Sequence, residues 1–126
     1  MNGFLAVFLG GGIGAAARHG VNLLAAQAAG SRFPWGTLAI NVLGSLLIGA
    51  LAEWFALRVQ LGQPLRLFLI TGVLGGFTTF SAFSLEVGLL MQRGQMLSAA
   101  GYVLASVLGA VGAMFLGMYV VRQLAT

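Results

Sequence analysis

The sequence has no cysteine and very few charged residues of any kind. Its 126 residues include six basic and two acidic side chains, and charged residues make up only 6% of the chain. Without cysteine there is no disulfide, no thiolate nucleophile and no cysteine-type metal site. The basic residues are all arginines, and the acidic ones are Glu53 and Glu86. Because no nucleophile–base pair and no cluster of metal ligands is visible, we do not expect an enzyme.

The formal net charge of +4 does not indicate a nucleic-acid partner. The arginines are scattered at the ends of apolar runs, where basic residues typically anchor a membrane protein, and they form no basic patch. Hydrophobic residues make up 60% of the chain, and the mean hydropathy is +1.02. This composition excludes a soluble globular domain and predicts that the protein lies in a lipid bilayer.

Four apolar runs account for almost the whole chain, and each is close to or above the roughly 20 residues that a tilted helix needs to cross a bilayer. They cover about residues 4–26, 35–57, 67–92 and 95–121. The connections between them are short and contain arginines, glycines and both prolines. The sequence therefore predicts an all-α membrane protein with a single four-span domain over residues 1–126. A signal peptide is an alternative interpretation of the N-terminal run, but that run has no basic n-region.

The arginines are divided evenly between the two ends of the predicted bundle. Four spans place both termini and the second connection on one side. The arginines of that side are Arg58, Arg66 and Arg122, and those of the other are Arg32, Arg93 and Arg18. Because the positive-inside rule has no excess of charge to act on, we predict insertion in both orientations. Two opposite copies can then form an antiparallel homodimer, whereas weaker cues would give a single orientation.

The third run contains a segment that contact with lipid does not explain. Residues 75–84 have the sequence Gly-Gly-Phe-Thr-Thr-Phe-Ser-Ala-Phe-Ser. Each glycine weakens a helix by about 1 kcal/mol relative to alanine, and the hydroxyls offer partners to backbone groups that leave the helix. Non-helical backbone at membrane depth occurs only next to protein or a water-filled cavity, and broken helices often build ion sites. We therefore predict a break in the third span, with a transport site at that break.

Two further patterns favour an ion path at the break. Thr37, Asn41 and Ser45 are spaced by four residues and lie on one face of the second span, although hydrogen bonding between helices would explain them as well. Phe80 and Phe83 are three residues apart and share a face of the third span. Aromatic ring edges carry a partial positive charge, so inward-pointing phenylalanines would present C–H edges to an anion without a full charge that traps it.

Three motifs follow one another along the chain. They are Gly11-Gly12-x-Gly14-Ala15-x-x-Arg18, Gly36-Thr37-Leu38-x-x-Asn41-x-x-Gly44, and Gly75-Gly76-Phe77-Thr78-Thr79-Phe80-Ser81-x-Phe83-Ser84. In order and spacing they resemble the CrcB/Fluc family of fluoride channels, and the similarity covers nearly the whole chain. The resemblance implies an antiparallel, dual-topology homodimer with two pores in the cell inner membrane. It would conduct fluoride passively out of the cell after uptake as HF.

The resemblance also implies roles for single residues. Phe80 and Phe83 look like the paired pore phenylalanines, and Asn41 looks like the asparagine that meets the anion. Gly75 and Thr78 resemble positions whose backbone carbonyls, from both subunits, hold a structural sodium ion. The remaining matches are the polar-track positions Thr37, Tyr102 and Ser106 and the vestibule residue Arg18. Fluoride needs hydrogen-bond donors in place of water, and those expected along the track are Asn41, Thr79, Ser81 and Tyr102.

Two other functions are compatible with a short chain of four spans. A small multidrug antiporter is also a dual-topology dimer, but proton exchange needs an acid within the membrane, and Glu53 and Glu86 lie toward span ends. A packing subunit without transport needs only small-residue stripes, such as Gly101, Ala105 and Gly109 in the fourth span. A break in the third span argues against the packing subunit, and dependence on a proton gradient would distinguish an antiporter from a channel.

Overall fold

The computed structural model describes residues 2–58 and 60–125, which form helices and short connections without any strand. Three helices are continuous, namely α1 (Gly3–Ala29), α2 (Trp35–Leu57) and α6 (Met96–Ala125). The third span, Gln63–Gln92, is composed of α3 (Gln63–Arg66), the π-helix η1 (Leu67–Leu74), α4 (Gly75–Phe77) and α5 (Phe80–Gln92). All four spans are long and apolar enough to cross a membrane, so the predicted all-α, four-span chain is confirmed at that level.

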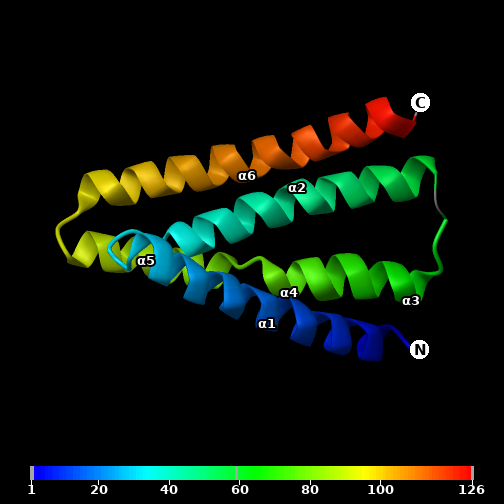
Figure 1. Ribbon diagram of the computed structural model, residues 1–126, viewed down its shortest axis with the longest axis horizontal. Coiled ribbons are helices and arrows are strands. Elements are labelled where there is room, and N and C mark those ends of the chain that lie inside the picture. Colours follow the sequence, from blue (N-terminus) through cyan, green and yellow to red (C-terminus); the bar gives the residue numbers. More distant parts are fainter. Residues whose placement is uncertain (1, 59, 126) are drawn as a thin grey trace.

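The start of α1 and the end of α6 lie at the same end of the bundle as the end of α2 and the start of α3, and the other two connections lie at the opposite end (Figure 1). The third span begins at Gln63, four residues earlier than the apolar run suggested. Pro64 occupies its first turn, where a missing backbone N–H costs nothing because that group has no helical partner. The proline therefore begins a helix here, although the sequence pattern placed it in a connection.

The helices pack in two principal pairs, α2 with α6 and α1 with η1 and α4 (Figure 1). Glycines allow the first pair to approach closely, because a Cβ on Gly117 would lie 2.9 Å from the backbone nitrogen of Ala50. The small-residue stripe of α6 is only partly used in this way. Its first members, Gly101 and Ala105, are exposed, whereas Gly117 is buried against α2.

A second close contact joins α1 to the third span. Gly10 and Gly14 are buried on the face of α1 that meets η1 and α4. A Cβ on Gly14 would lie 2.7 Å from the backbone nitrogen of Phe77, and a Cβ on Gly76 would lie 2.9 Å from the Cα of Gly11. Backbone therefore packs directly on backbone at the C-terminal end of α4, and no larger side chain fits between the two helices.

The third span is interrupted after Phe77. Thr78 and Thr79 have extended backbone, with φ/ψ of −82°/159° and −154°/124°, and α5 begins at the next residue. Both the amide and the hydroxyl of Thr78 donate to the Leu74 carbonyl at 3.0 Å, which closes the last turn before the interruption. The Thr79 hydroxyl accepts from the amide of Ala82 at 3.1 Å and caps the start of α5. The two threonines thus satisfy backbone groups that the interruption would otherwise leave without partners.

Polar contacts at the end with the termini fasten α6 to α2. Arg122 forms an ion pair of 2.9 Å with Glu53, whose side chain is buried. The guanidinium of Arg58 donates to the carbonyl oxygen of Ala125 near the C-terminal end of α6. The sequence left open whether Glu53 is solvated or paired with an arginine, and in the structure it is paired with Arg122.

Candidate functional site

A groove of about 420 Å³ lies beside the interruption of the third span. It is lined by residues of α2, of the interrupted span and of α6, which are Asn41, Ser45, Gly75, Thr78, Thr79, Phe80, Phe83, Ser106, Val107, Ala110 and Val111. The set includes seven of the eleven site residues that the sequence predicted, and it brings together positions up to 65 residues apart, from Asn41 to Ser106. The groove is therefore the natural centre of the candidate site.

Asn41 holds the backbone of the interruption from α2. Its side-chain nitrogen donates to the carbonyl of Thr79 at 3.0 Å, and its side-chain oxygen accepts from the amide of Thr79 at 2.8 Å. An asparagine amide has two N–H groups, and only one is used by Thr79. Because Asn41 also lines the groove, its second N–H is available to a ligand there. One side chain therefore combines support of the extended backbone with a hydrogen-bond donor.

Phe80 and Phe83 both border the groove but differ in burial. Their ring centroids are 5.5 Å apart, with planes inclined at 48°. Phe80 is 78% exposed, whereas Phe83 is only 7% exposed and lies 5.0 Å, centroid to centroid, from the ring of Tyr102. The pair therefore extends from the open side of the groove into the core of the protein.

Behind Phe83, two hydroxyl groups bind the carboxylate of Glu86. Thr37 donates to one carboxylate oxygen and Tyr102 donates to the other, each at 3.0 Å. Thr37 and Tyr102 are almost completely buried, and the three residues come from α2, α5 and α6. The sequence predicted Thr37 and Tyr102 as parts of a polar track but gave no partner for Glu86. Their separations from Glu86 along the chain, 49 and 16 residues, match no helical spacing.

The remaining predicted site residues differ in their surroundings. The Ser106 hydroxyl is buried at the groove and, among the described residues, is the one buried side-chain polar atom without a hydrogen-bond partner. Ser81 is exposed and lies outside the groove lining, 3.4 Å from the Thr79 hydroxyl. Arg18 lies on α1 and donates from its Nε atom to the carbonyl of Gly76 at 3.2 Å. The role of each in an ion path stays a prediction.

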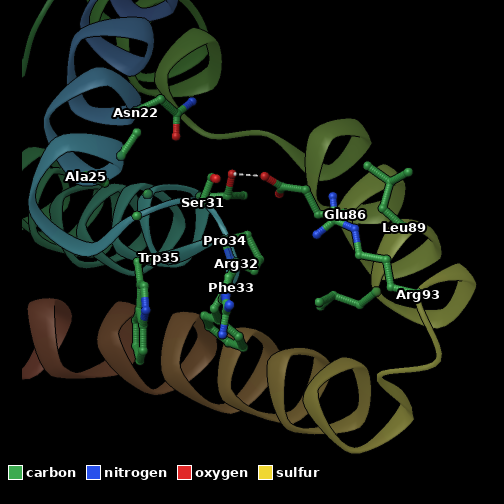
Figure 2. A pocket seen from close by; sticks show the side chains of 15 residues that line it. Asn22, Ala25, Ser31, Arg32, Phe33, Pro34, Trp35, Glu86, Leu89 and Arg93 are labelled. Atoms are coloured by element: carbon green, nitrogen blue, oxygen red, sulfur yellow. Dashed lines mark hydrogen bonds between the residues drawn. The ribbon is translucent and has the colours of Figure 1, made fainter.

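A second cavity of about 220 Å³ is lined in part by Glu86 and lies next to the connection between α1 and α2. Figure 2 shows Glu86 of α5, Arg93 directly after α5 and Asn22 of α1 around this cavity, with a hydrogen bond of Glu86 drawn as a dashed line. Thr37 and Arg32 also line this cavity. A chain of side-chain contacts runs from the groove toward the cavity, from Phe83 to Tyr102 and from Tyr102 to Glu86.

The structure offers backbone oxygens as possible metal ligands beside the groove. Within the described chain, no group of three or more histidine, cysteine or acidic side chains could hold a metal ion. In the same part of the chain, no cap or turn hydrogen bond reaches the carbonyl oxygen of Gly75 or Thr78. Both residues line the groove. Carbonyl oxygens of this kind suit a hard cation, which prefers oxygen ligands.

Comparison with known proteins identifies the family of this chain. Residues 5–118 match the family described as CrcB-like protein, Camphor Resistance (CrcB). The chain belongs to the CrcB family. It is 57% identical over 124 residues to the "Fluoride-specific ion channel FluC" of Granulibacter bethesdensis, covering 98% of both chains. The protein of the same name from Hyphomonas neptunium is 53% identical over 125 residues, again covering 98% of each chain. The resemblance seen in the sequence motifs is therefore confirmed.

A further relative from Nitrobacter hamburgensis, "Fluoride-specific ion channel FluC 2", is 52% identical and covers 96% of this chain and 98% of its own. These relatives are thus named as ion channels, a class without enzymatic activity. Together with the four candidate spans, this makes the chain a multi-pass membrane protein.

Proposed function

We propose that this protein is a fluoride-selective channel that passively exports fluoride across the inner membrane and so lowers its toxicity in the cytoplasm. The full-length similarity to proteins named fluoride-specific ion channels supports the ion. The observation that carries the proposal is the groove at Thr78 and Thr79, where an interrupted span exposes polar groups within an otherwise apolar bundle.

Conduction would follow the contacts that join the groove to the second cavity. An anion entering beside Asn41 would meet an amide N–H, the free hydroxyl of Ser106 and the edges of Phe80 and Phe83. It would then pass Tyr102 and Thr37, whose single hydroxyl protons would have to turn from Glu86 to the anion. Fluoride is small and strongly hydrated, so several weak donors in succession replace its water without a fixed positive charge that would hold it.

An open polar groove requires a cover if this span lies in lipid, and a second copy of the chain supplies one. Thr79 has extended backbone, Phe80 is 78% exposed, and Val107 and Val111 on the rim are about half exposed. Polar, non-helical backbone cannot face hydrocarbon. A copy in the opposite orientation would place two interruptions face to face about a two-fold axis, and the even division of arginines permits both orientations. The proposed unit is therefore an antiparallel, dual-topology homodimer with two pores.

We further propose a structural sodium ion at the axis of this dimer. The carbonyl oxygens of Gly75 and Thr78 fit a hard cation, because no cap or turn hydrogen bond within the described chain uses them. One protomer would supply two such oxygens, and the dimer would supply four. The bound ion would hold the two interrupted spans together by charge–dipole attraction.

The proton-coupled antiporter finds less support in the structure. Glu53 is paired with Arg122 at the end of the bundle, and both oxygens of Glu86 accept hydrogen bonds from hydroxyl groups. An exchanging carboxylate would have to alternate between a proton and a substrate, which favours an acid without such fixed partners. Neither glutamate has the surroundings that an antiporter needs.

The test is ion efflux from liposomes that contain the purified protein. Liposomes are loaded with fluoride or chloride, no proton gradient is imposed, and a potassium ionophore balances the charge while an ion-selective electrode records release. We expect rapid release of fluoride and slow release of chloride. Equal release of both ions, or fluoride release that appears only with an imposed proton gradient, would contradict the proposal. Liposomes without protein give the background leak.

A further inference from the structure

One face of α1 is directed at the end of α4. Gly10, Gly14 and Arg18 are spaced by four residues and therefore lie on the same face of the helix. The two glycines are buried against the third span, and they allow α1 to reach its backbone directly. Arg18, one turn further on, donates from Nε to the carbonyl oxygen of Gly76 at 3.2 Å. The arginine thus extends the glycine contact to the last turn before the interruption.

The carbonyl of Gly76 needs an external donor. In a helix the last four carbonyls have no partner, and here Thr78 and Thr79 are extended, so no following turn supplies an N–H. Thr78 satisfies Leu74, and Asn41 satisfies Thr79. The Gly76 carbonyl receives its hydrogen bond from Arg18. Arg18 on α1 and Asn41 on α2 therefore hold the two sides of the interruption.

A side-chain donor matters more at this position because the local sequence is flexible. Gly75 and Gly76 lack a Cβ, so their peptide planes turn more easily than those of other residues. A stiffer residue cannot replace Gly76, since its Cβ would lie 2.9 Å from the Cα of Gly11. The close packing of α1 thus requires glycine, and glycine in turn leaves the peptide plane to be fixed by hydrogen bonding.

We propose that Arg18 is a positioning residue that caps the C-terminal end of α4 and so fixes the backbone of the interrupted span. It acts through its hydrogen bond to the Gly76 carbonyl, and this role differs from that of a residue that only attracts anions at a vestibule. The cap is inferred from the contacts of Arg18, Gly10 and Gly14 with the third span. Its effect on conduction rests on the proposed channel function.

Three substitutions separate the cap from the charge. Glutamine carries its amide nitrogen at the same number of bonds from Cα as the Nε of arginine, so Arg18→Gln keeps the donor and removes the charge. Arg18→Lys keeps the charge, but its nitrogen is one bond further out. Arg18→Met removes both. Arg66→Gln is the matched control, because Arg66 is exposed on α3, near the start of the third span and more than ten residues before the interruption.

The first measurement is hydrogen–deuterium exchange of the full chain, followed in peptides that cover residues 74–83. Loss of a hydrogen bond from a charged donor shifts a local opening equilibrium by about tenfold or more. We therefore expect exchange at the interruption to be roughly tenfold faster in Arg18→Met and Arg18→Lys, with Arg18→Gln within about threefold of the native chain. The control should exchange like the native protein. Exchange as fast in Arg18→Gln as in Arg18→Met would overturn the cap.

Fluoride efflux from liposomes is measured on the same variants. We expect flux to follow exchange, so that Arg18→Gln conducts and Arg18→Lys does not. Full flux in Arg18→Lys together with loss in Arg18→Gln would assign Arg18 to electrostatic attraction and refute the positioning role. If the native protein releases no fluoride while the order of exchange rates is as expected, the channel function fails and the cap stands.

Discussion

Asn41→Asp is the most informative single change, because it replaces one atom in a side chain that contacts both the interruption and the groove. In the native protein the Thr79 amide donates to Asn41 Oδ1 at 2.8 Å, and the aspartate oxygen that takes this place can still accept that hydrogen bond. The other oxygen takes the place of the donor nitrogen, 3.0 Å from the Thr79 carbonyl oxygen. A hydrogen bond is thereby replaced by repulsion between two acceptors, and both N–H donors of the side chain are lost.

The expected energetic cost is large. A carbonyl left without its partner costs about 1–3 kcal/mol, and we take the low end because the contact is only partly buried. A carboxylate within a span adds about 2.5–3.5 kcal/mol on insertion scales. The sum of at least about 3 kcal/mol corresponds to more than about a hundredfold in an equilibrium or a rate. The new negative charge also repels an anion in the groove, so we expect fluoride efflux to fall below detection.

The assay is fluoride efflux from liposomes, with size-exclusion chromatography to check that the variant is folded. Asn41→Ala removes both hydrogen bonds without adding charge, and we expect it to conduct more than the aspartate variant. Asn2→Asp is the control for the chemical change, since Asn2 caps α1 away from the groove and aspartate caps a helix equally well. Native efflux in Asn41→Asp would show that Asn41 does not contact the path.

Phe80→Ile and Phe83→Ile should each abolish fluoride efflux while the protein stays assembled, because isoleucine has no polarised ring edge; Phe4→Ile, at a position 93% exposed on α1, is the control. Unchanged efflux in both groove variants would refute the aromatic path. Arg122→Met should destabilise the protein by about 2 kcal/mol, less than the full cost of a broken buried pair because Arg122 is 61% exposed. Thermal unfolding in detergent measures the loss of stability. Adding Glu53→Gln to Arg122→Met should recover part of that stability, because the buried charge is then removed as well. No recovery would mean that the broken ion pair is not the cause of the loss.

The apolar pattern was sufficient to predict the spans because each span is a local feature. Twenty apolar residues in a row leave the backbone one way to satisfy its hydrogen bonds in lipid, which is a helix. Span boundaries were less certain, as Pro64 shows. A proline is favourable in a first turn and in a connection alike, so composition could not choose between them.

Part of the candidate groove comes from residues that are neighbours in sequence. The segment of residues 75–84 indicated its own importance through paired glycines and hydroxyls, and it contains five of the seven predicted positions that line the groove. The partners of Glu86 and of Arg18 were not predictable. Thr37 and Tyr102 lie 49 and 16 residues from Glu86, and Gly76 lies 58 residues from Arg18, so only the packing of helices brings them together.

The sequence by itself determined the class of protein, its four spans and its family. These follow from hydropathy, local helix propensity and motif spacing, which act over a few residues or one helix. The tertiary structure alone decided which polar groups meet. It buried Phe83 against Tyr102 and left Phe80 open, and it placed Asn41 and Arg18 on opposite sides of the interruption. Those contacts depend on glycine-mediated distances between helices, which no single segment encodes.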